Sequence, residues 1–341
     1  MSLIRLSKSA LIHNLSTLKD RGGKAEVAVV LKDNAYGHGL NEIAALCAEN
    51  GARYAVVRNR AEAKAIAPLF KEILILADVP SLDAPENASF AINDERDAAK
   101  WASGTKVHLK VDSGMRRNGV AIDSVARTID ALLDRGLILR GVFSHPRSAD
   151  RLSTELFWQE KNFEKIRAAV EKTCARNNID PPKFHLYNSA ALLRNGAADQ
   201  YDLVRVGVAL YGYCDLRIPF DKPPLKPVLS LWAQKIADRK LCVADRVGYG
   251  GVFEAKEAMR AGVYDIGYGD GFLRLNGLEG YETPSGKKIL GRVSMDSVTI
   301  EGDDELICVL NDAEQLARLR GTISYEVLVR LNASIRREVV A

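Results

Sequence analysis

The sequence predicts an α/β protein with a (β/α)8 barrel over residues 1–215 and a mostly β C-terminal domain over residues 225–341. Three observations lead to this prediction. Short apolar runs alternate with stretches of helical spacing through the first two-thirds of the chain. A segment with four prolines, LRIPFDKPPLKPV (216–228), then interrupts the alternation. Beyond it, short β-rich runs lie between glycine-containing and charged turns, and residues 1–8 are expected to pack with them.

Eight apolar runs provide the barrel strands, because buried parallel strands read as continuous apolar segments. The runs are EVAVVLK (26–32), RYAVV (53–57), ILILA (73–77), SFAI (89–92), KVHLKV (106–111), ILRGVFSH (138–145), KFHLY (183–187) and YDLVRV (201–206). Residues 40–52 and 154–177 are the clearest helices between them. Since the fourth run is the weakest signal, an open doubly wound sheet is the structural alternative.

The composition limits the range of functions. Hydrophobic residues make up 47% and charged residues 27%, and the net charge is +4 with no basic block, so a nucleic-acid partner is not expected. The five cysteines are far apart and form no CxxC pair, which argues against disulfides and a thiolate metal site and favours a reducing cytoplasm. No secretory signal and no run of 18 apolar residues occurs, so no membrane association is expected.

Polar residues follow several of the predicted strands, where barrel enzymes carry their catalytic groups. They include Lys32, Asn34, Tyr36, Asp112, Arg116, Arg117, His145, Asn188, Ser189, Arg205 and Gly207. A lysine at the start of a buried region is costly unless its charge is relieved, and an imine with an aldehyde cofactor relieves it. The alternative is that Lys32 only ends its strand in solvent.

The last two predicted strands suggest a phosphate site, since barrels frequently bind phosphate with the loops after strands seven and eight. YNSAALL provides Ser189 at a helix start, and VRVGVALYG provides the backbone around Gly207. Asn188 and Ser189 are also explained by a simple helix N-cap, so this pattern alone leaves both interpretations open.

The segment VLKDNAYGHG (30–39) resembles the pyridoxal phosphate-binding signature of alanine racemases. Further blocks follow in that family's order: KVDSGMRRNGV (110–120), GVFSHPRSAD (141–150), FHLYNSAALL (184–193), VRVGVALYG (204–212), LKPVLSL (225–231), RVGYGGVF (246–253), IGYGDGFLR (266–274), GRVSMDS (291–297) and TISYEV (322–327). The chain is therefore identified as a member of this family. Asp33, Asn118, VVRNRAEA (56–63) and the tail 330–340 depart from the usual family pattern.

The resemblance implies pyridoxal 5′-phosphate bound as a Schiff base on Lys32. Tyr36, Ser189, Gly207, Val208 and Tyr325 are then the phosphate contacts, with Val208 acting through its backbone N–H. Arg205 matches the arginine on the pyridine nitrogen, and His145 lies in the same network. Because arginine cannot accept a proton, we expect the ring to be a weaker electron sink than with an acidic partner, which limits side reactions.

The same resemblance implies reversible two-base racemisation of L- and D-alanine, with Lys32 and Tyr249 on opposite faces of the α-carbon. Arg117 and the backbone N–H of Met295 match the groups that hold the substrate carboxylate, and a bidentate arginine suits that task. Lys110 aligns with a lysine that is carbamylated in many members. Asn118 is a departure beside it, so a bound anion such as chloride is the alternative.

Family members are homodimers with shared sites, which places Tyr249, Tyr268, Met295 and Asp296 opposite the Lys32 of a second chain. The expected product, D-alanine, feeds peptidoglycan synthesis. Three alternatives remain at this point: a racemase for serine, lysine or a broad set of amino acids, a related amino-acid decarboxylase, and a non-enzymatic cofactor carrier. Arg205 and RVGYGGVF argue against the decarboxylase, and the C-terminal domain with Tyr249 argues against the carrier.

Overall fold

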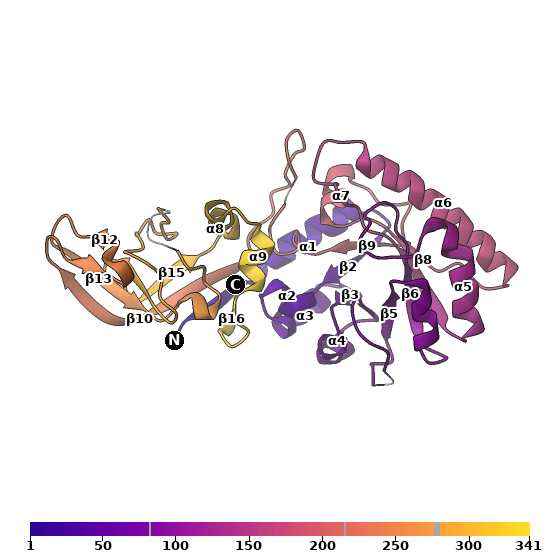
Figure 1. Cartoon of the computed structure of the whole chain (residues 1–341), viewed down its shortest axis with the longest axis horizontal. Helices are drawn as coiled ribbons and strands as arrows, with labels where there is room; N and C mark the ends of the chain where they lie inside the picture. The colour runs from indigo at the N-terminus through magenta and orange to yellow at the C-terminus, as the bar shows by residue number, and fades with distance from the viewer. Residues whose placement is uncertain (82, 215, 276–279) are drawn as a thin grey trace. The chain divides into compact units, whose positions relative to one another are not determined.

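The apolar runs of the first two-thirds form one parallel sheet in the computed structural model, which describes residues 1–81, 83–214, 216–275 and 280–341 (Figure 1). The strands follow one another in space in the order β8-β7-β6-β5-β4-β3-β2-β9. They are β2 (Glu26–Val30), β3 (Tyr54–Val57), β4 (Glu72–Ile75), β5 (Ala88–Ile92), β6 (Lys106–Lys110), β7 (Ile138–Phe143), β8 (Lys183–His185) and β9 (Leu203–Val206). The fourth predicted run is therefore a strand, β5, paired with β4 and β6.

Backbone hydrogen bonds bring the two outer strands of this sheet together. The Asp202 N–H donates to the Phe184 carbonyl at 2.9 Å, and the Arg205 N–H donates to the Tyr187 carbonyl at 3.0 Å. The sheet thus curves into a barrel, as the alternation of strands and helices predicts, and the open doubly wound sheet is wrong.

Helices follow most of the strands and bury one apolar face each. They are α1 (Lys8–Gly22), α2 (Lys32–Tyr36), α3 (Leu40–Glu49), α4 (Arg60–Ile66), α5 (Val125–Asp134), α6 (Glu155–Arg176) and α7 (Ser189–Asn195), with 3-10 turns η1 (Ala67–Leu69), η2 (Glu95–Lys100) and η3 (Ile122–Ser124). In α6, Leu156, Phe163, Ile166 and Val170 are buried at helical spacing, and the helix packs beside α5 (Figure 1). None of the helices in the described ranges combines the length and apolarity needed to cross a membrane.

The C-terminal part forms a second sheet, ordered β14-β13-β10-β1-β16, in which β15 also pairs with β10. Its strands are β1 (Leu3–Ser7), β10 (Leu229–Leu241), β13 (Met259–Tyr264), β14 (Val298–Glu301), β15 (Leu306–Leu310) and β16 (Arg336–Val340). The N-terminal strand β1 runs antiparallel to β10 and parallel to β16. A small hairpin, β11 (Arg246–Val247) and β12 (Phe253–Glu254), carries the turn η4 (Tyr249–Gly251), and η5 (Tyr268–Asp270), α8 (Ala313–Arg320) and α9 (Ser324–Val329) complete this part.

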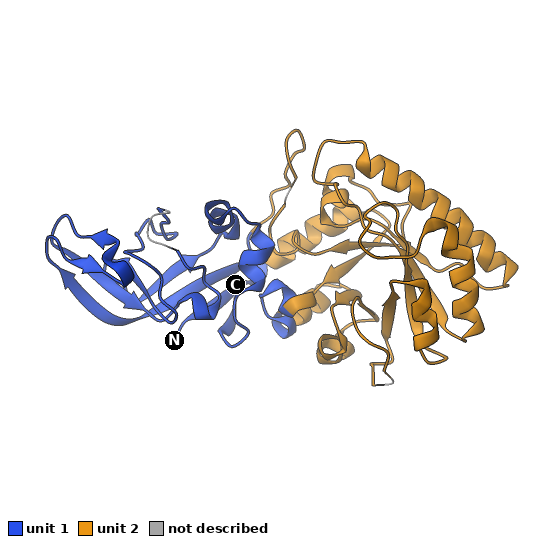
Figure 2. Ribbon diagram, in the orientation of Figure 1, with its two compact units in different colours: residues 1–10, 34–42, 227–341 blue, residues 11–33, 43–226 orange. Residues whose placement is uncertain are grey.

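The chain divides into two compact units (Figure 2). Unit 1 comprises residues 1–10, 34–42 and 227–341, and unit 2 comprises residues 11–33 and 43–226. Segment 34–42, which the sequence places in the barrel domain, belongs to unit 1 because it packs on that unit's C-terminal residues. Arg337 donates to the Gly37 carbonyl at 2.9 Å, and a side chain at Gly37 would collide with the Leu328 carbonyl.

The expected linker is held by the barrel unit. The side-chain amide of Asn14 donates to the carbonyls of Leu210 and Lys226, and the Lys226 N–H donates back to Asn14 Oδ1 at 2.9 Å. Asn14 is fully buried, so these bonds satisfy its polar atoms and fix the end of the proline-rich segment on α1.

Candidate active site

Basic side chains gather at the C-terminal ends of the barrel strands. Burial is the largest cause that lowers the pKa of His145, to about 3, and the charges of Arg205, Lys110, Arg117 and Lys32 lower it further. These five predicted site residues come from the ends of β2, β6, β7 and β9. His145 is therefore a neutral imidazole among cations.

Lys32 begins α2, a turn with an unusual backbone. Asp33, Asn34, Ala35 and Tyr36 all have φ between 52° and 55°, so the turn is left-handed. Such a conformation costs about 1–2 kcal/mol per non-glycine residue. Hydrogen bonds from the N–H groups of Gly39 and Leu40 to Asn34 hold its far end. Consecutive strained residues directly after Lys32 indicate a site whose geometry is fixed by its surroundings.

Two departures from the family pattern contact each other beside Lys32. The Asp33 carboxylate lies 3.9 Å from Lys32 Nζ and accepts a hydrogen bond from Arg58 at 3.0 Å. Arg58 belongs to the atypical segment 56–63. The additional acidic charge next to Lys32 is thus balanced by an additional basic one.

Arg205 lies inside the barrel, only 6% exposed. One terminal nitrogen donates to His185 Nδ1 and to the His185 carbonyl, both at 2.9 Å, and the other donates to the carbonyls of Ser144 and Leu186 at 2.6 and 3.2 Å. These bonds use all four hydrogens of the terminal nitrogens. Within the described part of the chain they leave the Nε–H for a ligand. Burial lowers the pKa of Arg205 from its ordinary value.

Lys110 is buried, only 9% exposed, and is influenced by the charge of Arg117. Burial and the Arg117 charge lower the pKa of Lys110 to about 8. Its ammonium donates to Asn118 Oδ1 at 2.5 Å, and Asn118 donates in turn to Asn93 Oδ1 at 3.0 Å. The atypical Asn118 therefore supplies a neutral acceptor to Lys110, close to the like charge of Arg117.

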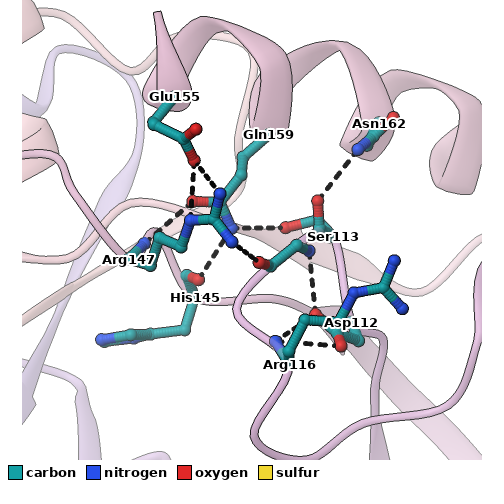
Figure 3. A network of polar contacts seen from close by, with 9 residues as sticks. Asp112, Ser113, Arg116, His145, Arg147, Glu155, Gln159 and Asn162 are labelled. Atoms are coloured by element: carbon teal, nitrogen blue, oxygen red, sulfur yellow. Dashed lines mark hydrogen bonds and ion pairs between the residues drawn. The ribbon is translucent and has the colours of Figure 1, made fainter. Parts of the chain in front are cut away.

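The loop that carries Arg117 is held by polar contacts (Figure 3). The Asp112 carboxylate accepts from the backbone N–H groups of Gly114 and Arg116. Arg116, with φ 57°, sits in the left-handed region at the loop tip. The buried Gln159 of α6 donates to Ser113 Oγ and to the His145 carbonyl, both at 3.2 Å. One helix side chain thus joins the loop after β6 to the loop after β7.

Ser189 and Gly207, both predicted phosphate contacts, meet directly. The Gly207 N–H donates to Ser189 Oγ at 3.0 Å. Asn188 caps α7 by accepting from the Ala191 N–H, so its N-cap role is real as well. Val208, in the turn after β9, is buried. The fully buried Tyr211 of that turn donates to the Val30 carbonyl at 2.9 Å, which ties it to the strand before Lys32.

The remaining predicted residues lie in unit 1. The rings of Tyr36 and Tyr325 are 5.8 Å apart, so two predicted phosphate contacts are neighbours there. Tyr268 and Met295 lie in adjacent loops, since the Gly269 N–H donates to the Met295 carbonyl at 2.8 Å and Asp296 is next in sequence. Tyr249 is 69% exposed and Met295 55%, so both side chains are open to solvent in the single chain.

Three residues that were not predicted as site residues are joined to Arg205 by a line of hydrogen bonds: His185, His108 and Glu72. The signal that could have found the two histidines is a polar residue within a buried parallel strand. Among the described residues no group of acidic, histidine and cysteine side chains is arranged to hold a metal ion.

Two family models match the chain. The model described as alanine racemase, N-terminal domain, matches residues 6–215, and that described as alanine racemase, C-terminal domain, matches residues 228–339. Curated relatives include alanine racemase from Nitratiruptor sp., 48% identical over 99% of each chain, and alanine racemase from Campylobacter curvus, 42% identical over the full length of both.

The fold is also similar to that of solved structures. The crystal structure of alanine racemase from Bacillus anthracis with bound L-Ala-P superposes with a TM-score of 0.85 at 26% identity, covering 100% of this chain and 95% of that one. The similarity thus includes both the barrel and the C-terminal sheet.

Proposed function

The chain belongs to the alanine racemase family, and we propose that it interconverts L- and D-alanine with pyridoxal 5′-phosphate carried on Lys32. The observation that carries the cofactor assignment is the cationic cluster at the strand ends. Phosphate and carboxylate groups are anions that arginine and lysine bind well. The Arg205 Nε–H, which has no partner among the described residues, is a suitable donor for a ring nitrogen.

The residues present fit this cofactor. When bound, it supplies an electron-withdrawing ring that acidifies the α-hydrogen of an attached amino acid. Lys32 provides the amine that holds the cofactor aldehyde. Ser189, Gly207 and the Val208 N–H, with Tyr36 and Tyr325, are the proposed phosphate contacts. Support comes from the Ser189–Gly207 hydrogen bond and from the neighbouring rings of Tyr36 and Tyr325.

The proton transfers need a base on each face of the α-carbon. We assign one to the Lys32 amine and the other to the Tyr249 phenol of a second subunit. Arg117 binds the substrate carboxylate, and His145 accompanies Arg205 as a neutral side chain. Met295 contributes its backbone N–H to the carboxylate, and Tyr268 and Asp296 line the same side from the second subunit.

A shared site in a homodimer is supported by the exposure of Tyr249 and Met295. We further propose a cytoplasmic location, supported by the five free cysteines.

For Lys110 we propose an unmodified amine held by Asn118, in place of the carbamate that the resemblance implies. NMR of the protein with ¹³C-bicarbonate should then show no carbamate signal. A carbamate signal that is present in the wild type and absent in Lys110→Met would contradict this proposal.

Racemisation of L-alanine, followed by chiral chromatography, tests the proposal. Lys32→Ala and Tyr249→Phe should both reduce turnover by at least about a hundredfold, as expected for removal of an acid–base group. Unchanged activity in either variant removes that residue from the mechanism. A panel with serine and lysine tests the substrate, and alanine ranking below both would favour the broader racemase.

A further inference from the structure

A line of four buried polar side chains crosses the interior of the barrel. Glu72 Oε1 lies 2.9 Å from His108 Nε2, His108 Nδ1 lies 2.9 Å from His185 Nε2, and His185 Nδ1 lies 2.9 Å from an Arg205 terminal nitrogen. They come from β4, β6, β8 and β9, and none is more than 8% exposed. At the far end, Lys183 donates to the second Glu72 oxygen at 2.6 Å.

The two ends of this line determine where its protons lie. Arg205 can only donate, so His185 Nδ1 must accept. Burial raises the pKa of Glu72, but the contacts with His108 and Lys183 outweigh this and lower it to about 2. The ionised carboxylate can only accept, so His108 Nε2 must donate.

One hydrogen then remains for the bond between the two rings. If His108 donated it, His185 would accept at both nitrogens and would have to be an imidazolate. His185 Nε2 therefore donates to His108 Nδ1, and both rings are neutral Nε2–H tautomers. In agreement with this, burial lowers the pKa of His108 and lowers that of His185 well below its ordinary value.

The geometry points to Glu72 as a positioning residue for Arg205. Acting through His108 and His185, the Glu72 carboxylate fixes the direction of each hydrogen bond in the line. The terminal nitrogens of Arg205 then donate inside the barrel, and its Nε–H remains for the cofactor ring. This proposal rests on the proposed function in one respect, which is that the group Arg205 faces is the cofactor ring. Glu72 supplies the negative charge that a buried guanidinium needs. It does so at a distance from the ring nitrogen, so the carboxylate is not in a position to protonate that nitrogen. A cavity of about 10 Å³ borders the line, close to the space of one water molecule.

Glu72→Gln should reverse the direction of the hydrogen bonds along this line. Lys183 has no acceptor atom, so the amide must turn its oxygen to Lys183 and its NH₂ to His108. Both imidazoles should then become Nδ1–H tautomers, and His185 should lose its bond with Arg205. Lys183→Met keeps the carboxylate and serves as the matched control. In the double variant, the amide oxygen can turn back to His108 and the original tautomers should return.

The experiment is ¹⁵N NMR of histidine-labelled apoprotein, which has only five histidines to resolve. We expect Nε2–H tautomers at His108 and His185 in the wild type, in Lys183→Met and in the double variant, and Nδ1–H tautomers in Glu72→Gln. An Nδ1–H tautomer at either ring of the wild type, or unchanged rings in Glu72→Gln, would overturn the proposal. The wild-type spectrum decides the matter if Glu72→Gln does not fold.

A cofactor titration gives the second readout. Glu72→Gln should weaken pyridoxal phosphate binding about tenfold, the usual effect of losing one charge-assisted hydrogen bond, whereas Lys183→Met should change it less than about twofold. Tautomers that switch while affinity stays constant overturn the link between Glu72 and the cofactor. Absence of binding to the wild-type protein contradicts the proposed function instead.

Discussion

At the scale of single residues, His145 shows how burial, together with the surrounding cations, controls protonation. Its pKa is lowered to about 3, so the folded protein binds this proton less readily than the unfolded chain. Between pH 6.5 and about 3 the unfolded state holds more protons, and the free energy of unfolding falls as the pH falls. Stability supplied by neutral His145 is therefore fully present above pH 6.5 and is lost in acid.

His145→Gln should make the free energy of unfolding depend less steeply on pH. Below pH 6.5 the slope should decrease by at most about 1.4 kcal/mol per pH unit, the value for one proton. Urea titrations of the apoprotein at pH 7, 6 and 5 measure this. Parallel curves for His145→Gln and wild type would contradict the assignment.

The gathering of the proposed site residues at the strand ends could be predicted, because the ends of barrel strands are recognisable from apolar runs. The supporting residues could not. Gln159 lies in the middle of α6 and looks like an ordinary polar helix residue, and only the tertiary structure shows it bonded to two loops. His185 and His108 were open to prediction as polar residues in buried strands, but their partner Glu72 begins β4 and reads as a strand end.

At the scale of elements, the left-handed turn α2 is the feature that local sequence preference opposes. Asp33 and Asn34 tolerate positive φ, but Ala35 and Tyr36 do not favour it. Packing within unit 1 compensates, through the Arg337 bond to Gly37 and the ring contact of Tyr36. The strands, in contrast, were predictable to within a few residues, because apolar runs suffice for a buried parallel strand.

Gly37→Ala tests how firmly this turn is held. A side chain there would lie 2.0 Å from the Leu328 carbonyl, at φ 80°. We expect a loss of at least about 2 kcal/mol in stability, since both strain and collision oppose the substitution. Gly286→Ala is the matched control, because its φ is 77° but nothing lies within 4 Å. Equal unfolding free energies for the two variants would show that Gly37 is not constrained by unit 1.

At the scale of the whole molecule, the proposed site residues are divided between two units. The barrel unit carries Lys32, Arg117, His145 and Arg205, and unit 1 carries Tyr249, Tyr268 and Met295. The sequence predicts a barrel and a C-terminal β domain, but the assignment of 34–42 to unit 1 depends on long-range packing that no local pattern reports.

Mixed dimers test the shared site. Lys32→Ala and Tyr249→Phe should each be nearly inactive alone. After unfolding and refolding together, half of the dimers are mixed, and each mixed dimer regains one intact site, so activity should return to roughly a quarter of wild type. Recovery requires that Lys32 and Tyr249 of one site come from different chains. No recovery, with mixed dimers confirmed by mass spectrometry, would place both residues of a site in the same chain.

The most direct measurement is borohydride reduction of the purified wild-type protein with added pyridoxal phosphate, followed by peptide mass mapping. Reduction fixes the cofactor irreversibly on the amine that carries it. We expect a single pyridoxyl-phosphate label, on the peptide that contains Lys32, and loss of that label in Lys32→Ala. A label on another lysine, or none, would contradict the assignment of the strand-end cationic cluster as the cofactor site.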